Sequence, residues 1–110
     1  TFYFAGDTGY NDVDFKSIGN TWKGIDLSLI PIGAYMPQVF MNPDHISPEE
    51  AVRIHNDVGS KLSVGMHFGT FRLSDEELMR PSYDLSMELS KKQIEPKFFR
   101  TLAHGYEINW

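Results

Sequence analysis

Three polar side chains in this sequence stand where functional residues often gather, in loops next to regular elements. Asp7 and His67 each follow an apolar run typical of a strand, and His45 comes two residues before the helix start signal at Ser47. A histidine at the end of a strand can present one ring nitrogen to a metal ion while an acceptor holds the other nitrogen. These three residues are therefore candidates for metal-binding or catalytic roles.

Each of the three also has an ordinary structural interpretation. Asp7 stands near glycines and can hydrogen-bond its own backbone in a turn. His67 can be a core or surface histidine, and His45 can support the start of the helix. We interpret the other two histidines as structural, His55 within the predicted helix and His104 beside a glycine. Local sequence alone leaves the roles of the first three open.

The tripeptide Asp7-Thr8-Gly9 is also found at the catalytic aspartate of aspartic proteases, some of which are dimers of short chains. Those chains are nearly all-β. The helix signals in this sequence contradict that architecture, so the protease interpretation is set aside.

The elements that must position these residues alternate between strands and helices. The apolar runs predict strands at Phe2–Gly6, Ile25–Ile32, Leu62–Met66, Phe98–Leu102 and Tyr106–Trp110. Helices are expected at Asp14–Ile18 with Asp14 as cap and Gly19 as stop, from Ser47 to Gly59, and after Pro81 with Leu85 and Leu89 one turn apart. This order favours an α/β layer with helices on one side, which leaves the other face of the sheet bare. Half of a sandwich fits that arrangement better than a finished domain.

The helix that begins at Ser47 carries the clearest signal. Ser47 and Glu50 form a capping box, and Pro48 occupies the first helical position, where its missing N–H has no cost. Apolar residues then recur at helical spacing until Gly59, namely Ala51, Ile54 and Val58.

Composition excludes several classes of function. The 110 residues are 41% apolar and 14% aromatic, which is enough to bury a core. The net charge of −5 argues against binding along a nucleic-acid backbone. The sequence has no cysteine, so neither a disulfide framework nor a thiolate metal site is available. It has no apolar run of the length of a membrane span and no signal peptide, and its first residues already read as a strand in progress. We expect the chain to be cut from a longer one.

Four motifs occur in a fixed order along the chain. They are Phe4-Ala5-Gly6-Asp7-Thr8-Gly9-Tyr10, Leu29-Ile30-Pro31-Ile32-Gly33-Ala34-Tyr35, His45-Ile46-Ser47-Pro48-Glu49-Glu50-Ala51 and Met66-His67-Phe68-Gly69-Thr70-Phe71. Over essentially its whole length the sequence resembles the C-terminal half of the N-acyl-phosphatidylethanolamine-hydrolysing phospholipase D group of metallo-β-lactamase-fold enzymes. The resemblance implies an α/β fold, the C-terminal half of an αββα sandwich, with residues 1–110 forming the C-terminal part of a single hydrolase domain. The His-x-His-x-Asp-His motif and one further histidine of the family lie upstream of the chain.

The resemblance also implies a site with two zinc ions. By it, Asp7 matches the carboxylate that bridges the two ions and is part of the catalytic machinery, and His67 matches a terminal ligand of one ion. His45 matches a catalytic histidine on the substrate side, which contacts the phosphodiester or its leaving group. A hydroxide between two zinc ions about 3.5–4 Å apart is a competent nucleophile near neutral pH.

Two stretches depart from the family pattern. Family members often have Arg and Trp where this chain has Gln38 and Val39, and some have Gln where this chain has Asp44 before His45. An acidic side chain facing a phosphate is mildly repulsive. Asp44, His45 and Tyr35 are the expected substrate-binding residues, His45 by the resemblance and Asp44 as its neighbour. Tyr35, like Phe40 and Phe71, is an aromatic residue near a motif that lines a lipid path or belongs to the core.

The resulting hypothesis is a zinc-dependent phosphodiesterase that hydrolyses N-acyl-phosphatidylethanolamine to N-acylethanolamine and phosphatidic acid, with this chain inactive by itself. The alternatives are a hydrolase of another phosphodiester or of a lactone, and a non-catalytic scaffold that lost its metals. The expected partners are the phospholipid substrate, a membrane surface reached through the full-length protein, and a second copy of the chain in a homodimer. The expected location is intracellular and membrane-associated.

Overall fold

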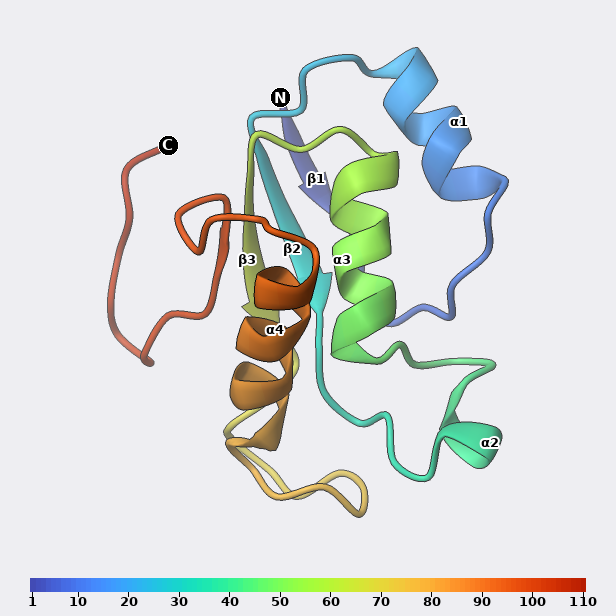
Figure 1. The fold of residues 1–110 in the computed structure, drawn as a ribbon, viewed down its shortest axis with the longest axis vertical. Coiled ribbons are helices and arrows are strands. Elements are labelled where there is room, and N and C mark those ends of the chain that lie inside the picture. Colours follow the sequence, from blue (N-terminus) through green and yellow to red (C-terminus); the bar gives the residue numbers. More distant parts are fainter.

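One sheet of four parallel strands organises the molecule, in the order β1-β2-β3-β4. Figure 1 labels β1, β2 and β3. The computed structural model describes all of residues 1–110. The strands are β1 Phe2–Phe4, β2 Leu27–Pro31, β3 Leu62–Met66 and β4 Phe99–Arg100. In a parallel sheet every strand ends at the same edge, so the loops that follow the strands meet there.

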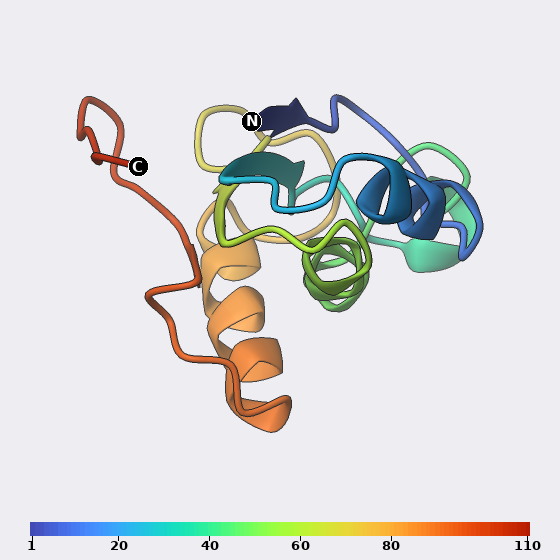
Figure 2. The same ribbon diagram turned by 90° about the horizontal axis from the view of Figure 1, so that it is seen from above.

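Four helices connect these strands, and two of them cover one face of the sheet. They are α1 Asp14–Thr21, α2 Gln38–Met41, α3 Pro48–Asp57 and α4 Arg80–Lys91. Figure 2 shows α3 and α4 side by side beneath the sheet, with α1 packed farther out against α3. None of the helices combines the length and the apolar stretch that crossing a membrane requires.

The register of the strands separates a core face from an open face. Tyr3 of β1, Ile30 of β2 and Phe99 of β4 point toward the helices and belong to or pack on the main apolar cluster. Phe2 and Phe4 point the other way and are 50% and 58% exposed. The prediction of helices on one side of the sheet is confirmed, and the opposite face is partly bare.

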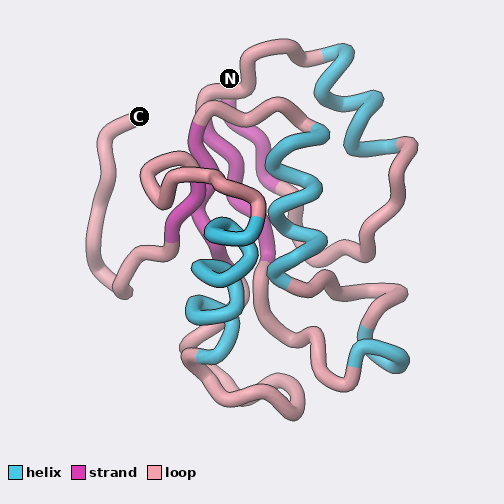
Figure 3. The backbone as a smooth tube through the Cα atoms, in the orientation of Figure 1, coloured by secondary structure: helices cyan, strands magenta, loops and turns pink.

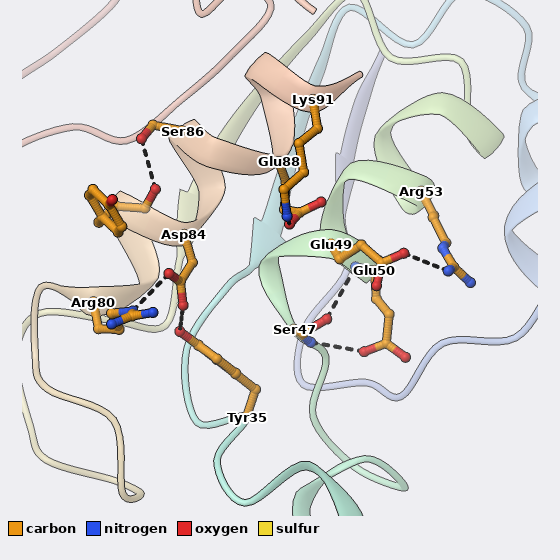
Figure 4. Close-up of polar contacts among 11 residues, drawn as sticks. Tyr35, Ser47, Glu49, Glu50, Arg53, Arg80, Asp84, Ser86, Glu88 and Lys91 are labelled. Carbon is orange, nitrogen blue, oxygen red and sulfur yellow. Dashed lines mark hydrogen bonds and ion pairs between the residues drawn. The ribbon is translucent and has the colours of Figure 1, made fainter. Parts of the chain in front are cut away.

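Helix α3 forms as the sequence predicts. The Ser47 side chain accepts a hydrogen bond from the Glu50 backbone N–H, and the Glu50 carboxylate accepts one from the Ser47 N–H (Figure 4). Pro48 is the first helical residue, and Gly59 follows the helix with a φ of +65°. A glycine takes that left-handed conformation without the steric cost that a Cβ atom brings.

Helix α1 differs from the prediction at both ends. The Asn11 side chain, and not Asp14, accepts the hydrogen bonds of the first free backbone N–H groups. The helix also passes through Gly19 and ends at Thr21. A Cβ atom on Gly19 would lie 2.2 Å from the Asp57 carbonyl oxygen, so this glycine lets α1 approach α3 closely and does not terminate the helix.

The C-terminal segment also departs from the prediction. Tyr106–Trp110 is not a strand, because no neighbouring strand pairs with its backbone (Figure 3). Its contact with the sheet is made by side chains, with the rings of Trp110 and Phe2 6.0 Å apart. The outer strands are shorter than their apolar runs, and the four-residue helix α2 lies where no element was predicted.

His55 is a buried structural histidine between α3 and the sheet. Its Nδ1 atom lies 2.8 Å from the Ser63 hydroxyl, and its ring packs 5.5 Å from that of Phe99. Burial disfavours the charged imidazolium and lowers the pKa of His55 to about 4.

We expect this burial to make the fold acid-sensitive. The unfolded chain protonates His55 near its ordinary pKa of about 6.5, whereas the folded chain does not until about pH 4. The free energy of unfolding therefore has its full value above pH 6.5. It falls by at most about 3 kcal/mol as the pH decreases towards 4. Urea unfolding of the complete protein at pH 7 and pH 4.5 measures this loss. A His55→Gln variant should show a smaller difference between the two pH values, and an unchanged difference would contradict the assignment.

Candidate metal centre

Asp7, His45 and His67 meet at the edge where the parallel strands end. Asp7 follows β1, His67 follows β3 directly, and His45 lies between α2 and α3. The Asp7 Oδ1 and His67 Nε2 atoms are 3.4 Å apart, and the imidazole rings of His45 and His67 stack with centroids 5.4 Å apart. One donor atom from each of the three lies within 4.8 Å of the other two. Residues separated by up to 60 positions in the chain thus form one cluster.

A tight contact between two loops positions His67. His67 has a φ of +62°, a left-handed conformation that costs a non-glycine residue free energy. A Cβ atom on Gly33, just after β2, would lie 2.1 Å from the His67 carbonyl oxygen. Only glycine at position 33 permits this approach, so the loop after β2 fixes the backbone of His67.

A second close contact positions the Asp7 loop. Gly6 has a φ of +68°, which turns the chain sharply after β1, as the glycines around Asp7 predict. A Cβ atom on Gly9 would lie 2.5 Å from the Pro43 carbonyl oxygen. The loop of Asp7 therefore packs directly on the segment that leads to His45.

The donor atoms of the cluster fit a divalent cation. Two ligands of one tetrahedral zinc ion, each about 2.0–2.2 Å from it, are about 3.4 Å apart, which is the separation between Asp7 and His67. The Nδ1 atoms of His45 and His67 are buried and have no hydrogen-bond partner. An unpaired buried imidazole nitrogen is costly. In His67 it is the nitrogen opposite Nε2, and Nε2 is the atom that faces Asp7 and is placed to bind a cation. The Asp7 side chain is 60% exposed, so the cluster is open to solvent on that side.

Glu76 braces the loop after β2, a role that sequence reasoning missed. Its carboxylate accepts hydrogen bonds from the backbone N–H groups of Ala34 and Met36, at 2.7 and 3.0 Å, and from the Ser74 hydroxyl. Burial by itself raises the pKa of Glu76, but these hydrogen bonds outweigh it and hold that pKa below its ordinary value. Ala34 has a φ of +65°, so the ionised carboxylate stabilises a strained loop next to Gly33. Nothing in the local sequence distinguishes Glu76 from other acidic loop residues.

The structure does not bring Tyr35 to the cluster. Its buried hydroxyl donates a hydrogen bond of 2.5 Å to the Asp84 carboxylate of α4 (Figure 4). Burial and this hydrogen bond raise the pKa of Tyr35 above its ordinary value. Tyr35 faces a cavity of about 480 Å³ between α3 and α4. None of the residues that line it also lines the cavity next to His67, which is described below. Asp44 is exposed in the loop directly before His45. Substrate contacts for both remain predictions.

A largely apolar cavity of about 560 Å³ opens beside His67. Phe68, Phe71 and Leu102 contribute to its wall, and so does His104. The Nε2 atom of His104 lies 3.2 Å from the Thr70 hydroxyl oxygen. From the sequence, His104 is expected only to lie in a turn. Its position near the loop after β3 depends on the path of the C-terminal segment, which the local sequence does not reveal.

The chain is similar to several known proteins. It is 42% identical over 106 residues to "N-acyl-phosphatidylethanolamine-hydrolyzing phospholipase D 1" of Caenorhabditis elegans, an alignment that covers 94% of this chain and 30% of that protein. It is 40% identical over 86 residues to the mitochondrial "N-acyl-phosphatidylethanolamine-hydrolyzing phospholipase D" of Saccharomyces cerevisiae, covering 77% of this chain and 18% of that protein. It is 36% identical over 97 residues to a "UPF0173 metal-dependent hydrolase" of Rubrobacter xylanophilus, an alignment that covers 86% of this chain and 36% of that protein. The chain thus spans about a third or less of the length of the first two relatives.

The family model described as "Beta-lactamase superfamily domain" matches residues 1–68, which include β1 to β3 and all three residues of the cluster. The parallel sheet with helices on one face agrees with the α/β architecture that the sequence predicts. From the match over more than half of its length, the chain belongs to the metallo-β-lactamase superfamily.

Proposed function

We propose that the complete protein containing this chain is a zinc-dependent phosphodiesterase of the phospholipase D type. Its proposed reaction is the hydrolysis of N-acyl-phosphatidylethanolamine to N-acylethanolamine and phosphatidic acid. The observation that carries the proposal is the convergence of Asp7, His45 and His67 at the edge where the strands end. The names of the worm and yeast relatives support the choice of substrate.

The three residues have distinct proposed roles. Asp7 would hold the two zinc ions with its carboxylate, and His67 would hold one of them through the ring nitrogen that faces Asp7. Zinc, when bound, lowers the pKa of water and stabilises negative charge on phosphoryl oxygens. His45, whose ring stacks on that of His67, orients the phosphodiester and holds a proton for the departing alcohol.

The two ligands in this chain are too few to hold two zinc ions tightly. Further ligands are expected from the rest of the protein, so we expect activity only from the complete protein. A phospholipid substrate also places the enzyme at a membrane surface, and we propose that this membrane is inside the cell.

Anomalous X-ray scattering at the zinc edge, from crystals of the complete protein, tests the metal centre. We expect two zinc ions, with Asp7 between them and His67 on one of them. A folded protein that binds no zinc after incubation with the metal would instead support a non-catalytic scaffold.

A screen of substrates tests the reaction itself. N-acyl-phosphatidylethanolamine should be cleaved faster than a lactone or a nucleotide phosphodiester by the zinc-loaded complete protein. Cleavage of one of the latter alone would retain the metal chemistry and reject the lipid substrate.

A further inference from the structure

The short helix α2 carries two of the most exposed apolar side chains of the molecule. Val39 is 98% exposed and Phe40 is 80% exposed. We define these two residues as the apolar tip. In Figure 1, α2 extends away from the body at the end of the molecule where β2 and β3 terminate. The loop between β3 and α4 lies at the same end and exposes Phe71, at 73%.

The apolar tip belongs to a long stretch without charge. The exposed part around the tip, Met36–Pro43, has no acidic, basic or histidine residue, and the exposed Asp44 follows it, whereas 25 of the 110 residues of the chain are Lys, Arg, Asp or Glu. Exposed surfaces that meet another protein usually carry polar and charged residues around an apolar centre. An uncharged protrusion that ends in Val and Phe instead fits the boundary between lipid headgroups and acyl chains, where charged side chains are disfavoured.

The apolar tip is also directly connected to the candidate metal centre. The backbone N–H of His45 donates a hydrogen bond of 2.9 Å to the carbonyl oxygen of Met41, the last residue of α2. The loop between β3 and α4 joins the same region, because the Asp75 N–H donates a hydrogen bond to the Met36 carbonyl oxygen. A surface bound by the tip would therefore lie beside His45.

We propose that the apolar tip inserts into the lipid surface that holds the substrate and so places His45 at the level of the headgroups. This inference rests on the proposed function for its choice of a lipid surface. The tip has no basic cluster beside it, so it should bind uncharged bilayers and should not require anionic lipids.

Vesicle binding and hydrolysis of the complete, zinc-loaded protein test the proposal. In V39S/F40S, cosedimentation with phosphatidylcholine vesicles should fall about tenfold, because two apolar side chains no longer enter the acyl region. The ratio of the rate on vesicles containing N-acyl-phosphatidylethanolamine to the rate on a short-chain, monomeric analogue should fall by a similar factor. The matched control is Trp22→Ser, which removes an apolar side chain that is 63% exposed and lies after α1, at the opposite edge of the sheet. This control should change neither quantity.

A second variant keeps the tip apolar and so covers the case in which V39S/F40S does not fold. Phe40→Trp should add a fluorescence component that phosphatidylcholine vesicles with brominated acyl chains quench, compared with the parent protein. Absence of quenching would overturn the proposal. So would vesicle binding by V39S/F40S equal to that of the parent, or a change from dimer to monomer in V39S/F40S without any change in vesicle binding.

These outcomes separate the two proposals. Vesicle binding and quenching do not depend on catalysis. If the tip inserts into bilayers but the protein has no phosphodiesterase activity, the proposed function alone is rejected. An active enzyme whose tip is neither quenched nor needed for binding would reject the membrane role alone.

Discussion

Replacing Asp7 by Asn in the complete protein should lower the rate of phosphodiester hydrolysis by about three orders of magnitude. The Asp7 carboxylate lies 3.4 Å from His67 Nε2 and is the only acidic group of the three-residue cluster. An amide has one oxygen acceptor and no charge, so it cannot hold two cations as a carboxylate does. The loss should appear in kcat, because the cations stabilise charge that develops during the reaction.

Two measurements on Asp7→Asn separate a lost metal centre from a lost fold. Zinc content, measured by atomic emission on the purified variant, should fall below that of the parent protein, while the midpoint of urea unfolding in the presence of a chelator should change little because Asp7 is exposed. Asp12→Asn is the matched control, since it removes the same charge from another exposed aspartate five residues away. Near-normal turnover by Asp7→Asn would remove Asp7 from the catalytic machinery.

The sequence predicts best those features whose causes are local. The capping box of Ser47 and Glu50 lies within four residues, and it places the start of α3 where the structure has it. The apolar run Leu62–Met66 is bounded by polar residues and coincides with β3. Since β1 and β3 end at one edge of a parallel sheet, Asp7 and His67 are placed at that same edge, on either side of the end of β2.

Features that depend on contacts between distant segments could not be predicted in this way. Gly19 looks like a helix stop in isolation, but it lies inside α1, where its lack of a Cβ atom lets α3 pack closely. Tyr106–Trp110 has the composition of a strand but has no strand partner. The hydroxyl of Tyr35 bonds to Asp84, 49 residues later, a partner that the local sequence does not reveal.

The same distinction applies to the surroundings of the candidate centre. Glu76 reaches the backbone N–H of Ala34 from 42 residues away, a pairing that no local pattern indicates. Phe40 reads in the sequence as an apolar residue near a motif, and its 80% exposure becomes evident only when α2 is seen to stand apart from the core. The candidate ligand residues can therefore be predicted from the sequence, whereas the groups that orient the loops cannot.

Among substitutions that add a single methyl group near the site, Gly33→Ala should lower the free energy of unfolding most. Its Cβ atom would lie 2.1 Å from the His67 carbonyl oxygen and 3.2 Å from the Phe68 Cβ atom. The first neighbour is backbone, and the hydrogen bond from the Ile32 N–H to the Met66 carbonyl oxygen ties the two loops together at 3.0 Å. The strands therefore cannot separate without breaking sheet hydrogen bonds, and we expect a loss of about 3 kcal/mol in the free energy of unfolding.

Gly59→Ala is the control for the Gly33 variant. Position 59 has no heavy atom within 4 Å of the added Cβ atom, but its φ is +65°. That variant should lose only about 1 kcal/mol, the cost of a left-handed alanine. Urea unfolding of the complete protein compares the two losses, and zinc titration compares the metal sites. Gly33→Ala should also weaken zinc binding, because the clash displaces the backbone of His67, whereas Gly59→Ala should leave it unchanged. Equal zinc affinity in the two variants would show that His67 does not depend on the loop after β2 for its position.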